Sequence, residues 1–378
     1  MSANDGQVIS TIKILDHKPE NAGWNLVILS EGFQAAELPA FERTAQNFVN
    51  TLQTTAPFDE VWDEINVFRI NVASTDSGAD DPAACGGTGA TPRTYFDSSF
   101  CNNGIQRLLV ADSGLALRVA NDNVEAVHMV VMLVNSTVYG GSGGSIAVCS
   151  MAPTAIEIAL HEMGHTAFGL ADEYSSYVGC GAANDNNNNY GIFEPSEPNV
   201  TRNTNRQTLK WRNFVDPATP LPTTQNADCT QCDPQPNPVS ASTVGLFVGA
   251  HYFHCGAYRP QFNCRMRNLG QPFCAVCQQR IRENFQCWLA QFDCIETRDE
   301  SYQRCDAEED QGYSRCTEQR DQGYRDCCDW IPCSWFCDAW VWISNIVCVA
   351  WTWVSHIVCV AWTWIVSIVC VAWRRLQC

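Results

Sequence analysis

The amino-acid sequence predicts a mixed α/β (α+β) domain followed by a tail of eleven-residue repeats. Residues 126–134 form a nearly continuous apolar run, which is typical of a strand buried on both faces of a sheet. Residues 161–165 place two histidines at helical spacing soon after that run. Beyond about residue 295 the chain changes to short repeats that recur every eleven residues.

Four segments ahead of residue 126 carry the patterns of regular elements. Residues 25–30 and 67–72 read as strands. Residues 38–52 predict an amphipathic helix, because large apolar residues recur there at helical spacing. We expect a further short helix within residues 102–115.

The residues around the two histidines predict turn, strand and helix in succession. A glycine-rich turn at residues 139–144 leads into a second short strand that ends near Val148. Pro153 suits the first turn of the next helix, where a missing N–H costs nothing. Gly169 suits the end of that helix, after which the chain turns back. A closing helix is expected at residues 281–292.

The run His161-Glu162-Met163-Gly164-His165 carries the chemistry. On a helix, His161 and His165 lie on one face and can each direct a ring nitrogen to one Zn²⁺ about 2.0–2.1 Å away. Glu162 lies beside the first ligand and can accept a proton from a metal-activated water as general base. The pattern therefore predicts a zinc-dependent peptide hydrolase, with protein or peptide as substrate.

A catalytic zinc site normally has three protein ligands and one open position. Asp172 is the first candidate for the third ligand, because it follows Gly169 by three residues. Glu173 is the second candidate, and His251 and His254 are more distant ones. The acidic pair could instead be a polar helix exit, or a partner that fixes the tautomer of a histidine.

Five segments together match one known family: residues 25–33, 139–143, 161–174, 256–260 and 263–267. In these segments the chain resembles the zinc metallopeptidases named for IgA peptidase. The resemblance covers roughly residues 8–290 and implies a secreted zinc endopeptidase of zincin-like fold. In such a fold the HExxH helix lies behind a mixed sheet, and an extended peptide can pair with the edge strand. It also implies that His161 and His165 bind metal and that Glu162 is the general base.

Two further roles follow from the resemblance. Met266 would lie in a turn beneath the metal, as in the methionine turn of metzincins, or would be a plain core methionine. Asn268 stands where metzincins have a tyrosine. Tyr258 could replace that tyrosine in stabilising an oxyanion, or could be a buried structural residue.

Composition limits the compartment and the partners. Twenty-two cysteines among 378 residues predict disulfides, and therefore an extracellular or cell-envelope location. Residues 1–6 have neither the basic start nor the apolar core of a signal peptide. A formal charge of −18 argues against nucleic acid and anionic membranes as partners.

The cysteine spacing suggests particular pairings. Cys85 and Cys101 flank a polar loop and could close it as a disulfide. Residues 229–232 and 274–277 are both CxxC pairs, which predicts either a structural Cys₄ zinc site or disulfides. We expect disulfides, because the separation between the two pairs is long and irregular.

The repeats divide the chain into three predicted domains: a zincin-like peptidase domain at 1–297, charged repeats at 298–336 and apolar repeats at 337–378. The charged repeats carry Tyr-x-x-Cys every eleven residues, which is three turns of helix and aligns these side chains in one stripe. Residues 339–373 contain no Asp, Glu, Lys or Arg and could span a bilayer by length.

Other features of the apolar repeats leave alternatives open. Tryptophans recur throughout instead of forming two interfacial belts, and β-branched residues dominate. A β-rich self-associating module or a disulfide-stapled stack would fit as well. We expect membrane or envelope attachment through 337–378, with Arg374-Arg375 as a basic stop, and self-association as the alternative.

Two classes of function remain. The first is an active zinc endopeptidase whose tail tethers or assembles it. The second is an adhesion or assembly protein that carries a protease-like domain. Intact His161, Glu162 and His165 favour the first class, because a mere carrier has no physical need for all three. A zinc amidase acting on a non-protein amide would use the same chemistry.

Overall fold

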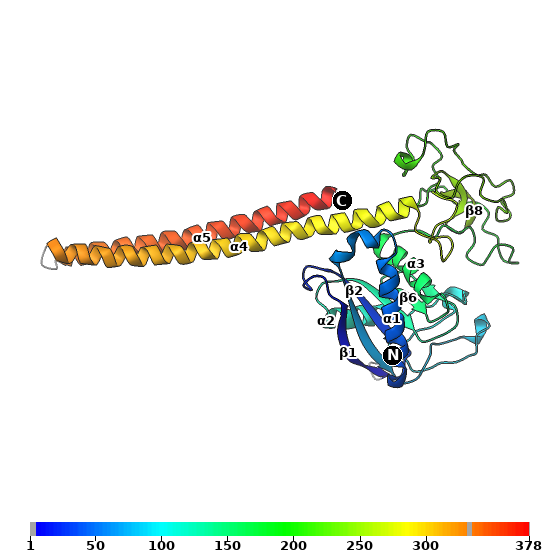
Figure 1. Cartoon of the computed structure of the whole chain (residues 1–378), viewed down its shortest axis with the longest axis horizontal. Coiled ribbons are helices and arrows are strands. Elements are labelled where there is room, and N and C mark those ends of the chain that lie inside the picture. Colours follow the sequence, from blue (N-terminus) through cyan, green and yellow to red (C-terminus); the bar gives the residue numbers. More distant parts are fainter. Residues whose placement is uncertain (1–4, 331–334, 378) are drawn as a thin grey trace. The chain divides into compact units, whose positions relative to one another are not determined.

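The computed structural model describes the backbone of residues 5–330 and 335–377. The chain divides into two compact units, Met1–Arg282 and Glu283–Cys378 (Figure 1). In and beside the helices, the structure does not describe the side chains of residues 290–293, 296, 324–338 and 373–378. The expected repeat at residues 324–327 and the expected basic stop at Arg374-Arg375 fall in that group.

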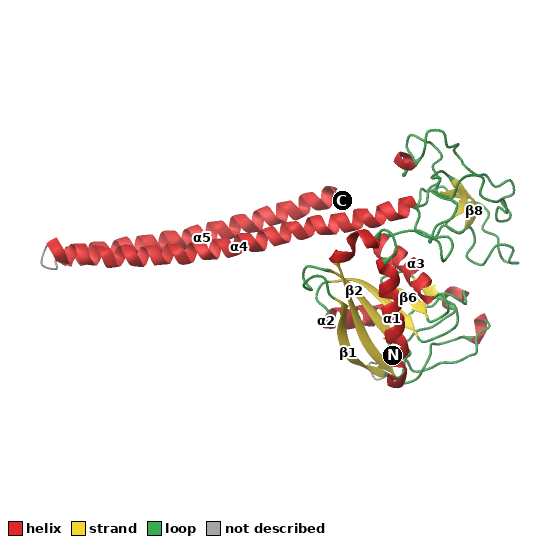
Figure 2. Ribbon diagram, viewed as in Figure 1, coloured by secondary structure: helices red, strands yellow, loops and turns green. Residues whose placement is uncertain are grey.

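A six-stranded mixed sheet forms the centre of the first unit (Figure 2). Its strands are β1 (Gly6–Leu15), β2 (Trp24–Glu31), β3 (Ile65–Ser74), β4 (Val127–Val134), β5 (Gly141–Ser142) and β6 (Ala147–Ser150), in the order β1-β3-β2-β4-β6-β5. The four central strands are parallel, and the edge strands β1 and β5 are antiparallel to their neighbours. Every residue of β2 is buried, which explains the apolar runs in the sequence.

Helices cover both faces of this sheet. Helix α2 (Ser113–Asn123) packs on one face, where Val27 and Leu29 belong to the same buried cluster. The alternate residues of β2 point the other way and are equally buried. On that side α1 (Leu38–Gln53) and α3 (Ala155–Phe168) contact each other and the strands (Figure 1). The carboxyl ends of β2, β4 and β6 therefore lead toward the loops around α3.

The structure confirms three expected strands and one expected helix, with bounds that differ by one or two residues. The strands at 25–30, 67–72 and 126–134 correspond to β2, β3 and β4, and the helix at 38–52 corresponds to α1. The short helix expected within 102–115 is present only as a single 3-10 turn at Asn102–Gly104, and the stretch from Ile105 to Leu109 that follows is not helical. Single β-bridges hold this segment extended, at Val110 to Ser99 and at Leu108 to Gly141. Helix α2 begins only at Ser113, where Oδ1 of Asp112 accepts a hydrogen bond from the Leu115 amide at 2.8 Å.

Four strands are not expected from the sequence. They are β1, β5 within the expected glycine-rich turn, and the two strands of a separate antiparallel sheet, β7 (Phe247–Ala250) and β8 (Phe253–Arg259). Helix α3 begins at Ala155, so Pro153 precedes the first turn instead of lying in it. Gly169 ends α3 as expected, with a left-handed φ of 62°.

The second unit consists of two long helices. Helix α4 (Ala275–Trp330) contains the expected closing helix at 281–292 and continues far beyond it. Helix α5 (Trp335–Gln377) carries the apolar repeats as helix and not as strands. Among the pairs whose two side chains are both described, three disulfides join the two helices: Cys294–Cys370, Cys305–Cys359 and Cys316–Cys348. Each step is eleven residues forward on α4 and eleven back on α5, so the helices run antiparallel with their repeats in register.

Candidate active site

Helix α3 brings two histidine rings to one point. Nε2 of His161 lies 3.2 Å from Nε2 of His165. The other ring nitrogens face backbone carbonyls: Nδ1 of His161 lies 3.0 Å from the Arg265 oxygen, and Nδ1 of His165 lies 2.6 Å from the Leu170 oxygen. A ring that donates its Nδ1–H to a carbonyl keeps the Nε2 lone pair free, so two lone pairs converge here.

Asp172 completes a triangle with these two nitrogens. The chain turns back after Gly169, and Oδ1 of Asp172 lies 3.0 Å from Nε2 of His161 and 3.3 Å from Nε2 of His165. Tetrahedral ligands about 2.0 Å from a zinc ion stand about 3.3 Å apart, so these three atoms have the spacing that zinc requires. Three electron-pair donors facing one point repel each other unless a cation lies between them, and the residues present fit a metal.

The electrostatics of the group agree with a cation-binding role. Burial alone would lower the pKa of His165, but the Asp172 and Glu162 carboxylates and the Leu170 carbonyl together outweigh burial and raise that pKa to about 9. Burial would raise the pKa of Asp172, yet the two histidines hold it well below its usual value. The carboxylate thus stays ionised and attracts positive charge.

Glu162 lies in the cleft beside this triangle. Its side chain lines the same hollows as His161 and is almost fully buried. Burial raises its pKa above the usual range, and the two histidines partly offset that effect. A carboxyl group with a raised pKa takes up and releases protons at a pH closer to neutrality, which a general base and acid requires.

The other third-ligand candidates lie elsewhere. Glu173 is fully buried and faces Cys274 and Cys277 instead of the histidines. His251 pairs with Glu197, Nε2 to Oε1 at 3.6 Å, and His254 pairs with Asp185, Nε2 to Oδ1 at 2.9 Å. Among the candidates from the sequence, Asp172 therefore is the one that the structure brings to His161 and His165.

Met266 and Tyr258 take different positions. Met266 is fully buried beneath α3, where a Cβ added to Gly164 would stand 2.7 Å from its sulfur. Gly164 lies between the two histidines on the helix, so Met266 supports the segment that carries them. Tyr258 lies in β8 and forms a backbone bridge with Thr201, and it lines neither hollow of the cleft.

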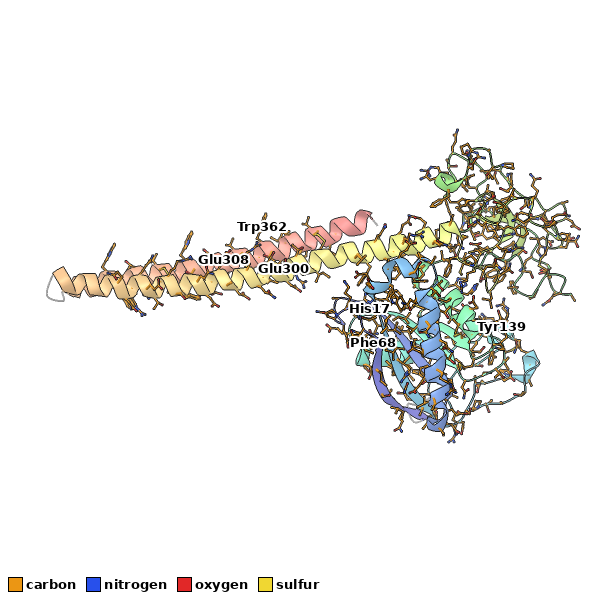
Figure 3. The ribbon with its side chains drawn as sticks, viewed as in Figure 1. His17, Phe68, Tyr139, Glu300, Glu308 and Trp362 are labelled. Carbon is orange, nitrogen blue, oxygen red and sulfur yellow. A yellow bond between two sulfur atoms is a disulfide. The ribbon has the colours of Figure 1, made fainter. Side chains whose placement is uncertain are left out.

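Two hollows of about 550 and 490 Å³ adjoin at His161 and Glu162. Arg107 lines both of them, and its Nη2 donates to the hydroxyl of Tyr174 at 3.2 Å. Tyrosines form much of the wall; they are Tyr139 (labelled in Figure 3), Tyr174, Tyr177 and Tyr252. A cleft that continues on both sides of the reactive groups can hold a chain that passes through.

Sequence reasoning missed Arg107 and Tyr252. The Tyr252 hydroxyl donates to Oδ2 of Asp172 at 2.6 Å, which leaves Oδ1 facing the histidines. Neither residue belongs to a motif, and each reaches the cleft from a separate loop. The glycine-rich turn, which the sequence did single out, lines the cleft at residues 141–143.

The strand edge beside the cleft is partly occupied. The Gly141 amide donates to the Arg107 carbonyl at 3.1 Å, and the Ser142 hydroxyl donates to the Leu109 carbonyl at 2.5 Å. The loop from Arg107 to Leu109 thus covers part of β5, so less of this edge is open to an extended peptide than the sequence predicted.

Disulfides hold the loops around the site. The expected pair Cys85–Cys101 is confirmed. Cys229 and Cys232 of the first CxxC pair also form disulfides, but with partners outside the motif: Cys229–Cys255 and Cys180–Cys232. The expectation of disulfides at Cys274 and Cys277 is wrong, because both are free and buried.

The chain matches one known protein family over the range that contains these residues. The sequence model of IgA peptidase M64 matches residues 12–234 and 235–285, a range that includes His161, Glu162, His165 and Asp172. The search of curated proteins found no match. The matched range covers most of the first unit and well over half of the chain. The chain therefore belongs to the IgA peptidase M64 family.

Proposed function

We propose that this chain is a zinc-dependent endopeptidase in which His161, His165 and Asp172 hold the metal and Glu162 is the general base. The observation that carries the proposal is the triangle of Nε2, Nε2 and Oδ1, with sides of 3.0–3.3 Å, beside a buried carboxyl group in an open-ended cleft. Membership of a peptidase family supports a protein or peptide substrate.

Different residues of the chain would have different roles in hydrolysis. A bound zinc ion would supply Lewis acidity, polarising a carbonyl and lowering the pKa of a water toward about 7. Glu162 accepts a proton from the attacking water and then delivers it to the departing amide nitrogen. The carbonyls of Arg265 and Leu170 fix the tautomers of the two histidines, and Tyr252 fixes Asp172.

The fold is proposed to be zincin-like. The HExxH segment lies on α3, which contacts β4, β5 and β6 of the mixed sheet. An extended peptide would pass through the two adjoining hollows and approach the sheet at residues 142–144, next to the covered part of β5. Cleavage within a chain, and not only at its ends, follows from a cleft that continues on both sides of Glu162.

The location is proposed to be extracellular or in the cell envelope. The loops of the first unit and the two helices of the second are joined by disulfides. Such bonds persist in oxidising compartments and are rare in a reducing cytosol. They indicate an oxidising environment.

The tail is proposed to attach the enzyme to a lipid surface. Residues 339–372 of α5 include an 18-residue stretch with a mean hydropathy of 2.1, of which only 11% is buried, so this helix is long and apolar enough to cross a membrane. Disulfides tie α5 to α4, whose repeats are charged, and moving each such charge into the hydrocarbon core costs about 2.5–3.5 kcal/mol. A hairpin lying along the interface keeps α4 in water and brings exposed tryptophans described on α5, such as Trp351 and Trp362, to headgroup level.

The first experiment measures zinc and hydrolysis together on the purified full-length chain. We expect cleavage of unfolded casein, and a fall of about 10²–10⁴-fold in Glu162→Gln with the metal retained. Glu125→Gln, which neutralises an exposed glutamate, should keep full activity. Zinc binding with no cleavage of casein would favour an adhesion protein, and hydrolysis of small amides alone would favour an amidase. A chain that binds no zinc at all would end the metallopeptidase proposal.

A further inference from the structure

A second group of metal-type ligands lies in the first unit, separate from the histidine triangle. It consists of Glu173, Cys264, Cys274 and Cys277. None of these side chains is more than 3% exposed, and their ligand atoms all lie within 4.8 Å of one another. None of the three thiols forms a disulfide.

The spacing of these atoms is that of a tetrahedral zinc site. Sγ of Cys264 lies 3.7 Å from Sγ of Cys277. Oε1 of Glu173 lies 3.3 Å from Sγ of Cys277 and 3.8 Å from Sγ of Cys274. Zn–S bonds of about 2.3 Å and a Zn–O bond of about 2.0 Å place sulfurs about 3.8 Å apart and a sulfur about 3.5 Å from the oxygen. We propose that these four side chains bind a second, structural zinc ion.

Metal-free packing of the three thiols would not explain why the Glu173 carboxylate is buried among them. Glu173 is fully buried, and its Oε2 has no hydrogen-bond partner among the described residues. An ionised carboxylate in such a place is costly unless a cation or a full set of donors satisfies it. A disulfide would need sulfurs about 2.05 Å apart, far closer than the 3.7 Å between Cys264 and Cys277. Soft thiolates in a tetrahedral arrangement favour zinc over calcium or magnesium.

The surroundings balance the charge of such a site. A zinc ion with three thiolates and one carboxylate carries a net charge of −2. Arg259, which is almost fully buried, and Arg267 both interact electrostatically with Glu173. Asn199 donates from Nδ2 to Oε1 of Glu173 at 2.9 Å, as an outer partner that orients a ligating carboxylate. All four zinc positions are filled by protein, so the site is closed to substrate.

The second site would hold parts of the catalytic site in place. Glu173 follows Asp172 directly, and its amide donates to the Met266 carbonyl at 2.7 Å. Cys264 precedes Arg265, whose carbonyl faces Nδ1 of His161. One ion would therefore fix both the segment that presents Asp172 and the segment that orients His161.

The test measures metal stoichiometry and spectra on the full-length chain, purified without chelator or reductant. We expect two zinc ions per chain, one of which is lost in Cys277→Ser and the other in His165→Ala. Cys149→Ser replaces another buried free thiol and should keep both ions. After exchange of zinc for Co²⁺, thiolate-to-cobalt charge-transfer absorption in the near ultraviolet should be present in the parent and in His165→Ala, and absent in Cys277→Ser.

The outcomes separate this inference from the proposed function. A chain with one ion, a thiolate band and no ion at the histidines would retain the second site and end the proposed enzyme mechanism. A chain whose only ion is lost in His165→Ala, or whose cobalt form lacks the thiolate band, would overturn the second site. A native mass that shows two of the three thiols joined by a disulfide would overturn it as well. If Cys277→Ser does not fold, the cobalt spectra of the parent and of His165→Ala decide.

Discussion

Single side chains around the histidine triangle set its geometry from outside. Tyr252 is the clearest case, because its hydroxyl donates to one oxygen of Asp172 and leaves the other oxygen facing His161 and His165. Without that bond the carboxylate can rotate, and binding a metal then requires it to be ordered again. The hydroxyl is therefore a positioning group for the proposed metal site.

Tyr252→Phe tests this role. The substitution keeps the ring and removes only the hydroxyl, so we expect zinc affinity to fall by about 10–100-fold. Competition with a chromogenic chelator measures the change, and hydrolysis measured at saturating zinc should recover most of the parent rate. Tyr190→Phe removes a hydroxyl from a tyrosine that lines neither hollow, and it should leave the affinity unchanged. Equal losses in both variants would argue against the role of Tyr252.

The residues of the site differ in how far sequence alone predicts them. His161, Glu162 and His165 are fixed relative to each other by one turn of helix, so local spacing identifies them. Asp172 is the first candidate because it follows Gly169 by three residues, and the left-handed turn at Gly169 brings it back to the histidines, although Glu173 remains a second candidate from the sequence. Arg107 and Tyr252 reach the cleft through loops whose paths depend on tertiary packing, and no local pattern indicates them.

At the scale of elements, the end of β2 depends on a close backbone approach. Gly32 has a φ of 69°, and a Cβ added there would stand 1.9 Å from the Gly78 carbonyl oxygen. The Gly78 amide donates to the Gly32 carbonyl at 2.9 Å, so the two glycines join the end of the strand to a neighbouring loop. Only a residue without a side chain fits this contact.

Gly32→Ala should therefore destabilise the first unit. Gly86→Ala is the matched control, because Gly86 also has a positive φ but nothing lies within 4 Å of its added Cβ. The left-handed strain is common to both variants, and the difference between them reports the steric overlap. We expect the free energy of unfolding of Gly32→Ala to fall by about 1–3 kcal/mol more than that of Gly86→Ala. Urea unfolding followed by fluorescence measures both, and equal midpoints would contradict the expectation.

Buried strands and the amphipathic helix were predictable because their patterns are local. The runs of β2 and β4 are mostly apolar, since helices cover both faces of the sheet. Strand β1 lies at an edge and is only half-buried, so its pattern is weak. The segment within 102–115 has helical spacing, but bridges to Ser99 and Gly141 outweigh that preference.

At the scale of the whole molecule, the described side chains of the second unit form no ordinary hydrophobic interface between its helices. Beyond Phe285, the buried side chains described in α4 and α5 are mostly small or sulfur-bearing: Cys294, Cys305, Cys316, Val341, Thr363 and Ser367. A Cβ added to Gly312 would stand 2.4 Å from Cγ2 of Thr352, so the two helices approach closely there. The large apolar side chains of α5 point outward instead, Trp362 among them (Figure 3).

Mild reduction should therefore loosen this unit. Each disulfide typically contributes about 2–4 kcal/mol, and little apolar burial between the helices remains to replace it. We expect reductant to make residues 283–378 sensitive to limited proteolysis, with the cut sites mapped by mass spectrometry. Protease resistance that persists after complete reduction would mean that the helices hold together without their disulfides.

The exposed face of α5 should bind lipid. Trp351 and Trp362 are 72% and 67% exposed, so carboxylates placed there would oppose insertion at an interface. We expect the oxidised full-length chain to float with zwitterionic vesicles in a density gradient, and Trp351→Glu with Trp362→Glu to abolish flotation. Glu300→Gln on α4 should leave flotation unchanged. A chain that sediments alone as a dimer would favour self-association through the same face.

The constant spacing of the disulfides between α4 and α5 makes this hairpin an adjustable spacer. Eleven residues of helix advance about 16.5 Å, and that distance separates successive disulfide-bonded cysteines along each helix. Removing or inserting one repeat in both helices together preserves every pairing and changes only the reach. Removing or inserting a repeat in one helix alone leaves one cysteine between the helices without a partner. Natural variation or protein engineering can therefore change the length of this hairpin in fixed increments while every disulfide pairing is kept.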